Sequence, residues 1–158
     1  MNVDKNQWVS SVMNQFEKRL LRYTGRFVTQ SSAQEIVQET FLRLFEQDPK
    51  QLDGRLAPWL FTVCRNQALD RCRKEGRAPQ PEGGPIAPNP EEQASAAQQK
   101  TSLNILVSGL KPEQQEVIRL KFEEDMSYKE ISTVTGHSVS YVGVLIHEAM
   151  TELRKHYE

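Results

Sequence analysis

The side chains most able to do chemistry in this sequence lie in one basic and aromatic segment near its middle. Arg65, Lys74 and Arg77 could contact phosphates. Trp59 and Phe61 offer flat rings on which unstacked bases could rest. Such a mixture suits a protein that binds single-stranded nucleic acid. It equally fits a core helix with a solvated basic end, and the residue types alone leave both interpretations open.

A second candidate surface lies in the last third of the chain. Ser127 with Glu130 predicts a capped short helix, Gly136 supplies a turn, and Ser138 caps a further helix. This is a helix-turn-helix pattern, whose second helix enters the major groove of DNA. The second helix, predicted to run from about residue 139 to about residue 154, carries no Lys or Arg before its last turn. The pattern indicates a DNA-binding unit with an unusually uncharged recognition helix.

Catalytic and metal-binding patterns are absent from the sequence. It has no phosphate-binding glycine loop, no HExxH motif and no nucleophile elbow. His137, His147 and His156 lack the cysteine or acid cluster that would complete a metal site. Cys64 and Cys72 are expected to be reduced, half-buried thiols. We therefore expect no catalytic residue, metal, cofactor or small-molecule substrate, and no enzyme.

Helical periodicity predicts the elements that must position these residues. Apolar side chains over residues 8–27 recur at three- and four-residue steps, which predicts an amphipathic helix of about 20 residues. Ser32 and Glu35 predict a capping box for a second helix, which Pro49 ends. Pro58 suits the first turn of a third helix. The apolar stripe of the second helix comprises Ile36, Val37, Thr40, Phe41, Leu44 and Phe45.

Composition separates two helical units. Residues 76–91 hold five of the eight prolines and three of the eight glycines, and no apolar period continues through them. Such a segment cannot bury enough apolar surface to fold. We therefore predict an all-α chain of two small helical domains, residues 1–76 and residues 96–158. A flexible Pro/Gly-rich linker over residues 77–95 joins them, and the second domain contains the helix-turn-helix.

Charge is distributed unevenly, although the net charge is only −1. Residues 1–78 hold 13 basic and 9 acidic side chains, net +4, whereas residues 79–99 hold no base and 3 acids, net −3. Residues 100–158 hold 7 bases and 9 acids, net −2. No global field attracts the chain to nucleic acid, so any contact must be local. With no signal peptide and no apolar run of about 18 residues, we expect a cytoplasmic protein without membrane insertion.

Three segments resemble, in order and spacing, conserved parts of RNA polymerase sigma factors, specifically the extracytoplasmic-function (ECF) group of the sigma-70 family. Residues 57–70 resemble the region 2 helix, with Trp-Leu, then Arg-Asn, then Asp followed by basic residues. Residues 35–45 resemble the polymerase-binding helix. Residues 110–131 resemble the start of region 4 and its helix-turn-helix. Residues 76–95, where the family has its linker, lie outside the resemblance.

The resemblance implies a chain that binds core RNA polymerase, recognises and opens a promoter, and starts transcription, with an anti-sigma factor as a further partner. The polymerase-binding residues would be Glu35, Gln38, Phe41, Leu42 and Arg43. The residues at the −10 element, where a base leaves the stack, would be Trp59, Phe61, Arg65, Asn66, Asp70, Arg73, Lys74 and Arg77. The residues at the −35 element would be Ser138, Ser140, Tyr141, Gly143, Val144 and His147.

The chain departs from the family pattern at two places. Glu35 is preceded by Ala-Gln, so one acid is missing from the pair that often opens the polymerase-binding helix. Gly143, Leu145 and Glu148 stand where cations are usual in the recognition helix. Bidentate arginine–guanine contacts are then unavailable, which implies weaker or shape-based recognition of the −35 element. Phosphate contacts could come from the helix N-terminus and from Lys111, Arg119, Lys121 and Lys129.

Two other functions stay open at this point. A sigma-like protein could dock on polymerase or on an anti-sigma factor while binding duplex DNA only weakly, as the uncharged recognition helix suggests. A plain helix-turn-helix regulator would explain residues 100–158 but would leave the segment from Trp59 to Lys74 without a role.

Overall fold

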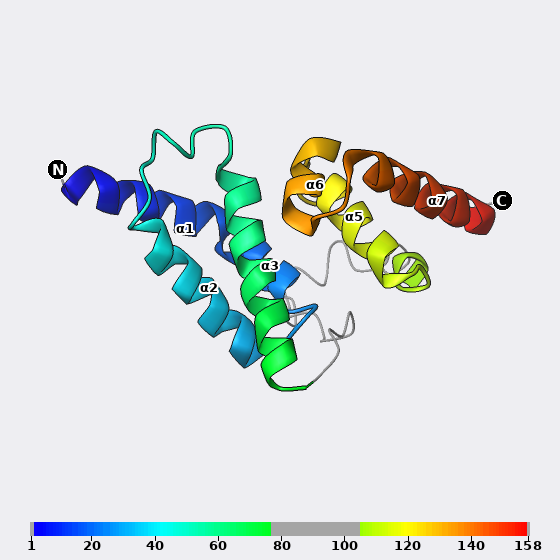
Figure 1. The fold of residues 1–158 in the computed structure, drawn as a ribbon, viewed down its shortest axis with the longest axis horizontal. Coiled ribbons are helices and arrows are strands. Elements are labelled where there is room, and N and C mark those ends of the chain that lie inside the picture. Colours follow the sequence, from blue (N-terminus) through cyan, green and yellow to red (C-terminus); the bar gives the residue numbers. More distant parts are fainter. Residues whose placement is uncertain (1, 77–104, 158) are drawn as a thin grey trace, which may run out of the picture. The chain divides into compact units, whose positions relative to one another are not determined.

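The computed structural model describes residues 2–76 and 105–157, and all regular secondary structure in these two stretches is helical. The chain divides into two compact units, Met1–Ala87 and Pro88–Glu158, and each is described by itself (Figure 1). The all-α prediction is confirmed. The predicted linker, residues 77–95, lies outside the described residues. Within the two described stretches, no helix has both the length and the apolarity that crossing a membrane requires.

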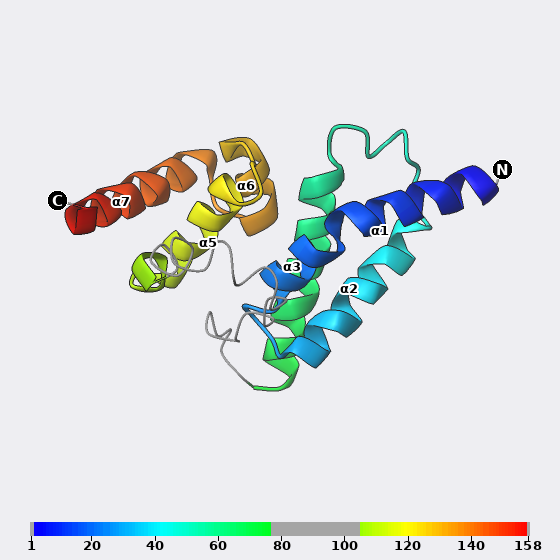
Figure 2. The same cartoon turned by 180° about the vertical axis from the view of Figure 1, so that it is seen from behind.

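The first unit packs α1 (Asn2–Thr24), α2 (Gln30–Leu44) and α3 (Leu56–Lys74) against one another. Figures 1 and 2 show these three helices from opposite sides. The helices form because apolar side chains recur once per turn, and burying that stripe stabilises the unit. The core side chains include Val9, Val12, Phe16, Leu20, Ile36, Val37, Phe41, Leu44, Leu60, Phe61, Cys64 and Ala68.

α2 begins earlier than the sequence predicts. Its N-cap is Thr29, whose hydroxyl oxygen accepts a hydrogen bond from the backbone N–H of Ser32 at 3.3 Å. The predicted capping box of Ser32 with Glu35 is therefore wrong, since both residues lie inside the helix. Ala33, in the first turn of α2, is fully buried.

The second unit packs α5 (Pro112–Phe122), α6 (Tyr128–Thr135) and α7 (Val139–Tyr157), and residues 105–108 add one turn of helix before them. Each of the three helices contacts the other two. Figure 2 shows α6 and α7 meeting at a short turn. The core side chains include Val107, Leu110, Val117, Ile118, Leu120, Met126, Ile131, Val134, Val142, Leu145, Ile146 and Ala149.

The capping residues of α6 and α7 and the turn between these helices are those that the helix-turn-helix pattern predicts. Ser127 and Glu130 form a capping box, with Ser127 Oγ accepting from the Glu130 N–H at 3.1 Å and Glu130 Oε1 accepting from the Ser127 N–H at 2.9 Å. Gly136 ends α6 at φ +82°, in the left-handed region that favours glycine. Ser138 Oγ accepts from the Tyr141 N–H at 3.1 Å and so caps α7.

Candidate nucleic-acid and protein-binding surfaces

Four of the predicted −10 residues share the outward side of α3. Trp59, Asn66, Asp70 and Arg73 fall within about 60° of one another around the helix axis, because they lie seven, four and three residues apart. Asn66, Asp70 and Arg73 are exposed, and Trp59 is partly exposed. We call this row the α3 outer face. It offers a ring for stacking, an amide for a base edge and a cation for phosphate.

The last turn of α3 concentrates positive charge at the end of this face. Arg73 and Lys74 are 79% and 77% exposed. The carboxylate of Asp70 lies 3.9 Å from Arg73 Nη2 and 3.2 Å from Lys74 Nζ. Exposed ion pairs of this kind contribute little to stability. Both cations therefore stay accessible to a phosphate backbone.

The structure corrects the prediction for Phe61. Its ring is fully buried and meets the ring of Tyr23 edge-to-face, with centroids 5.1 Å apart. Phe61 follows Trp59 by two residues, which places it on the opposite side of a helix. It cannot stack on a base and is part of the core. Arg65 is partly buried beside the α3 outer face, and Arg77 lies outside the described residues.

The outward side of α2 presents apolar side chains between polar ones. Gln38, Leu42 and Phe45 fall within about 60° of one another around the helix, and we call them the α2 outer face. Leu42 is 61% exposed and Phe45 is 39% exposed. The ion pair between Glu39 and Arg43, 3.6 Å long, flanks them. Apolar anchors inside a charged rim are typical of a helix that docks on another protein.

The sequence predicts both Phe41 and Phe45 in the apolar stripe of α2, and the structure confirms this for Phe41 but not for Phe45. The phenyl ring of Phe41 is only 4% exposed, so the prediction that it contacts a partner is wrong and it belongs to the core. Phe45 was expected in the buried stripe, yet it is the exposed aromatic of α2. Its spacing of seven residues from Gln38 and three from Leu42 is the signal that could have identified it.

Glu35 does not open α2, because it lies well inside the helix. Its carboxylate instead accepts a hydrogen bond from Arg71 Nη1 at 2.9 Å, in an ion pair that joins α2 to α3. Glu35 therefore positions α3 relative to α2. The Glu35 side chain is 64% exposed, so it is also accessible to a partner.

A buried hydrogen-bond network also fixes α3 against α2. The Thr40 hydroxyl donates to the Ile36 carbonyl at 2.8 Å, lies 3.3 Å from Cys64 Sγ and accepts from Gln67 Nε2 at 3.0 Å. Cys64 is buried rather than half-buried, as is Cys72. Burial raises the pKa of the Cys64 thiol to about 11, although its contact with Thr40 opposes this increase. The thiol therefore stays protonated and unreactive at neutral pH.

The outward side of α7 carries three of the predicted −35 residues. Ser140, Val144 and His147 follow one another at steps of one helical turn, and all three are exposed. We call them the α7 outer face. Val144 is 48% exposed. The basic residues of α7 are confined to its last turn. The face that would meet DNA is therefore neutral and partly apolar.

Tyr141 and Gly143 lie to either side of the α7 outer face and serve the packing of the unit. The Tyr141 hydroxyl donates to Glu113 Oε2 at 2.9 Å, and this bond to a carboxylate raises the pKa of the tyrosine. A Cβ on Gly143 would meet the ring of Tyr128 at 3.5 Å. That distance is an ordinary van der Waals contact, so Gly143 lies beside the ring without being required by it. Neither residue projects with Val144.

The predicted phosphate contacts of the second unit are partly corrected. Arg119 is only 8% exposed and forms an ion pair with Glu123 at 2.7 Å, so it is a core cation rather than a DNA contact. Lys121 lies over the ring of Tyr128, with its Nζ 5.4 Å from the ring centroid. Lys129 is exposed in the first turn of α6. Lys111, before α5, is exposed as well, so Lys111 and Lys129 are the two of these cations that remain accessible to a phosphate.

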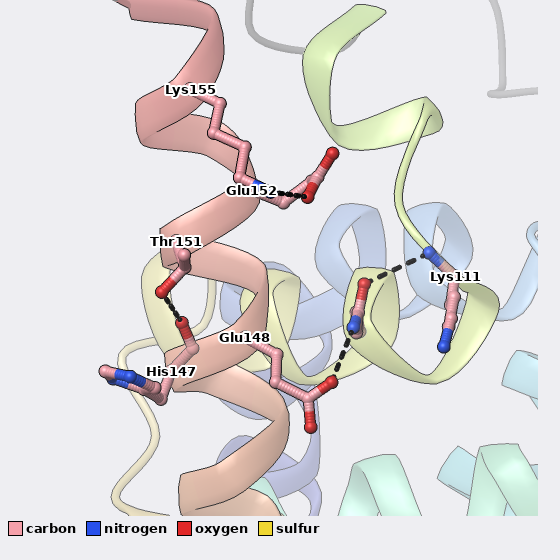
Figure 3. Close-up of polar contacts among 7 residues, drawn as sticks. Lys111, His147, Glu148, Thr151, Glu152 and Lys155 are labelled. Carbon is pink, nitrogen blue, oxygen red and sulfur yellow. Dashed lines mark hydrogen bonds and ion pairs between the residues drawn. The ribbon is translucent and has the colours of Figure 1, made fainter.

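A groove of about 560 Å³ runs between the start of α5 and the second half of α7. Gln114 Nε2 donates to Glu148 Oε2 at 3.5 Å across it, and its Oε1 accepts from the backbone N–H of Lys111 at 3.3 Å (Figure 3). Glu148 thus points toward α5, whereas His147 points away from it (Figure 3). Glu148, which stands where the family usually has a cation, therefore contacts its own unit.

Among the described residues, no group of three or more His, Cys, Asp or Glu side chains is placed to hold a metal ion. Two pockets in these stretches are open to solvent. Neither is lined by a nucleophilic side chain that is hydrogen-bonded to the side chain of a general base. The chemistry available to these surfaces is stacking, hydrogen bonding and ion pairing.

Two family definitions match the chain. Residues 12–78 match Sigma-70 region 2, and residues 106–155 match Sigma-70, region 4. The first match contains the α2 and α3 outer faces, and the second contains the helix-turn-helix. Their order along the chain is the order that the sequence predicts.

Curated relatives carry the same family name. The chain is 28% identical over 151 residues to the ECF RNA polymerase sigma factor SigE of Mycolicibacterium smegmatis, covering 90% of this chain and 59% of that relative. It is 30% identical over 142 residues to the ECF RNA polymerase sigma factor SigL of Mycobacterium tuberculosis, covering 85% and 77%. The chain thus spans well under two thirds of the first relative and about three quarters of the second.

A solved structure shares the fold. CnrH, determined in complex with the cytosolic domain of CnrY, superposes with a TM-score of 0.62 at 21% identity, covering 95% of this chain and 87% of CnrH.

Proposed function

Because this chain belongs to the ECF group of the sigma-70 family, we propose that it binds core RNA polymerase and directs promoter recognition, DNA opening and transcription initiation. The observation that carries the proposal is the presence of regions 2 and 4, in order, on two compact units. We assign residues 1–76 to region 2, residues 77–95 to a linker and residues 96–158 to region 4. Polymerase would perform the chemistry, so the chain itself would be no enzyme.

The α2 outer face would dock on polymerase. Leu42 and Phe45 supply the apolar contact, and Gln38 lies between them on the same side. The charged neighbours Glu39 and Arg43 would form a rim that sets orientation more than affinity. Buried apolar anchors usually supply most of the binding energy of such an interface.

The α3 outer face would engage the −10 element as it opens. Unstacking a base step costs a few kcal/mol, which contacts to the released strand must offset. Trp59 would stack, and the amide of Asn66 has both a donor and an acceptor for a flipped base edge. Arg73 and Lys74 would follow the phosphates. The proximity of these groups on one helix supports this assignment.

The helix-turn-helix would place α7 in the major groove at the −35 element. The amides at the capped N-terminus of α7 would meet a phosphate, and Lys129 would contact another. The contribution of this unit to affinity would be small, because its recognition surface lacks charge.

An anti-sigma factor would be a further partner, acting where polymerase acts, in the cytoplasm. A helix face with exposed apolar anchors can serve an inhibitor as well as polymerase. An inhibitor that covers Leu42 and Phe45 would exclude polymerase by direct competition. A pull-down with polymerase and a candidate inhibitor, mixed in either order, would test this exclusion.

Reconstituted transcription tests the proposed function. The full chain is added to core polymerase, and run-off products are mapped from a library of genomic promoter fragments. We expect initiation at a discrete set of fragments that depends on the chain. Absence of initiation from every fragment, with core polymerase active alongside a known sigma factor, would reject the proposal.

One alternative draws on a specific observation. The neutral α7 outer face also fits a sigma-like protein that docks on polymerase without binding DNA strongly. Replacing Arg73 and Lys74 by Ala would leave the activity of such a protein unchanged. A sigma factor would lose promoter opening.

A further inference from the structure

The α7 outer face is built differently from one that reads guanine. Its central residue is Val144, 48% exposed, with Ser140 one turn before it. The only basic residues of α7 are in its last turn, at least two turns beyond Val144. A β-branched valine has little rotamer freedom in a helix, so its methyl groups are held in a fixed direction. Val144 therefore offers a defined apolar surface in the first half of α7.

We infer that Val144 recognises the C5-methyl groups of thymines in the duplex bound by region 4. This inference rests on the proposed function. In the major groove only thymine presents a methyl group, and apolar side chains are the ones that contact it. Guanine presents two acceptors that are read best by a bidentate arginine or lysine, and this face has neither of these residues. Charge and shape thus point to thymine rather than guanine.

The packing of α7 fixes the direction of Val144, toward the DNA major groove that α7 would enter. Its neighbours Val142 and Leu145 are buried at 0% and 4% exposure, which fixes the rotation of α7. The hydroxyl of Tyr141 is tied to Glu113 on α5 at 2.9 Å. A valine on a fixed helix can discriminate a single methyl group, because displacement of the helix would break these packed contacts.

The side chains around Val144 suit a base edge next to a thymine. Ser140 can donate or accept a hydrogen bond, and the His147 ring is exposed and points away from α5 (Figure 3). Both lie one turn from Val144 on the same side. Lys129, exposed at the start of α6, could contact a phosphate. The methyl contact would thus be framed by polar contacts.

Thymine-to-deoxyuridine substitution removes the methyl group and leaves base pairing unchanged. The test uses holoenzyme formed from core polymerase and the full chain, on a promoter that it transcribes. A footprint first locates the region 4 element, and each thymine in it is then replaced by deoxyuridine. We expect run-off initiation at limiting holoenzyme to fall about fourfold for each contacted methyl group, which corresponds to one buried methyl-sized group.

Two variants make the test specific. With Val144→Ala, thymine and deoxyuridine templates should give nearly equal initiation. Val139→Ala is the matched control, because Val139 is also 48% exposed on α7 but lies about 140° away around the helix. This control should keep the full preference for thymine.

Several outcomes would overturn the inference. One is normal initiation that is indifferent to deoxyuridine, and another is a footprinted element without thymine. Loss of polymerase or inhibitor binding by Val144→Ala, with no deoxyuridine effect, would assign Val144 to a protein contact instead. These results leave the proposed function intact. Absence of initiation from both the thymine template and the deoxyuridine template with wild-type holoenzyme would reject the proposed function itself and the inference with it.

Discussion

The outward sides of α3 and α7 differ in chemistry, although both are proposed to meet one promoter. The α3 outer face has a tryptophan, an amide and an accessible basic end, with Arg73 and Lys74 more than three-quarters exposed. The α7 outer face has a serine, a valine and a histidine, and its cations come only in the last turn. The first surface can bind a charged, unstacked strand. The second can distinguish base edges and contribute little long-range attraction.

This difference implies a division of roles between the two units. Polymerase would hold both units near the same DNA, so the second would bind at a high effective concentration without strong contacts of its own. The first unit would then supply most of the free energy of opening. The predictions below test that division, starting with the largest expected effect.

The double variant Leu42→Asp/Phe45→Asp should remove promoter binding by both units together. Charges on the apolar anchors of α2 would cost several kcal/mol at a desolvated interface. We expect at least about a hundredfold weaker binding to core polymerase, measured by fluorescence anisotropy. Met13→Asp, at a 36% exposed position on α1, is the control and should bind normally. Retained binding by the double variant would show that docking lies elsewhere.

Trp59→Ala should reduce promoter opening by about five- to a hundredfold, since stacking on an aromatic ring contributes about 1–3 kcal/mol per base. Stopped-flow fluorescence from a 2-aminopurine at the −10 element reports the opening. Trp8, the other tryptophan, is partly exposed on α1 and provides the matched alanine control. An equal loss in both variants would point to a folding defect.

The two units should differ in stability at alkaline pH. The Cys64 pKa is raised to about 11 in the folded state, so the folded protein keeps a proton that the unfolded chain loses above about pH 9. Stability of the first unit should therefore be full below about pH 9 and fall by about 2 kcal/mol toward pH 11. Chemical denaturation of wild type and Cys64→Ala at pH 8 and pH 10.5 measures the difference. An identical loss in both proteins would contradict this role of Cys64.

Salt dependence should separate the two basic helix ends. Arg73→Ala/Lys74→Ala should reduce the magnitude of the slope of log K for DNA binding against log salt concentration by about 1.5. The variant makes two fewer phosphate contacts, so fewer counterions are released on binding. Arg154→Ala/Lys155→Ala, in the last turn of α7, should change the slope little. Holoenzyme binding to promoter DNA is measured from 50 to 200 mM salt. A larger change for the α7 pair would reverse the proposed division.

The smallest effect concerns the stability of the recognition helix. Gly143→Ala should stabilise the second unit by about 0.5–1 kcal/mol, since alanine favours helix and its Cβ would make an ordinary contact with Tyr128 at 3.5 Å. Gly54→Ala in the first unit should destabilise, because Gly54 has φ +77°. Thermal unfolding followed by circular dichroism measures both. Destabilisation by Gly143→Ala would mean that the Tyr128 ring cannot move enough to accommodate the added Cβ.

Local signals in the sequence predicted the parts of the fold that short-range chemistry decides. The capping box of Ser127 with Glu130 and the turn at Gly136 are complete within ten residues, so they could be located without tertiary information. The order of the three sigma-like segments also identified the family. These signals place the candidate DNA-binding segments on their helices.

Tertiary packing decided what periodicity left ambiguous. Phe41 and Phe45 lie one turn apart and both fit an apolar stripe, but in the packed unit Phe41 is buried and Phe45 is exposed. Thr29 caps α2 three residues before the predicted Ser32. Arg119 was expected at phosphate, yet its pairing with Glu123 depends on the burial of α5, which charge alone does not reveal.

The central claim is that the α3 outer face opens the promoter while α7 refines its position. Permanganate reactivity of unpaired thymines, mapped on one promoter with wild-type and variant holoenzymes, tests it most directly. We expect reactive thymines around the −10 element with wild type, loss of that reactivity with Trp59→Ala/Asn66→Ala, and its retention with Val144→Ala at saturating holoenzyme. Unchanged reactivity in the α3 variant, or complete loss in the Val144 variant, would contradict it.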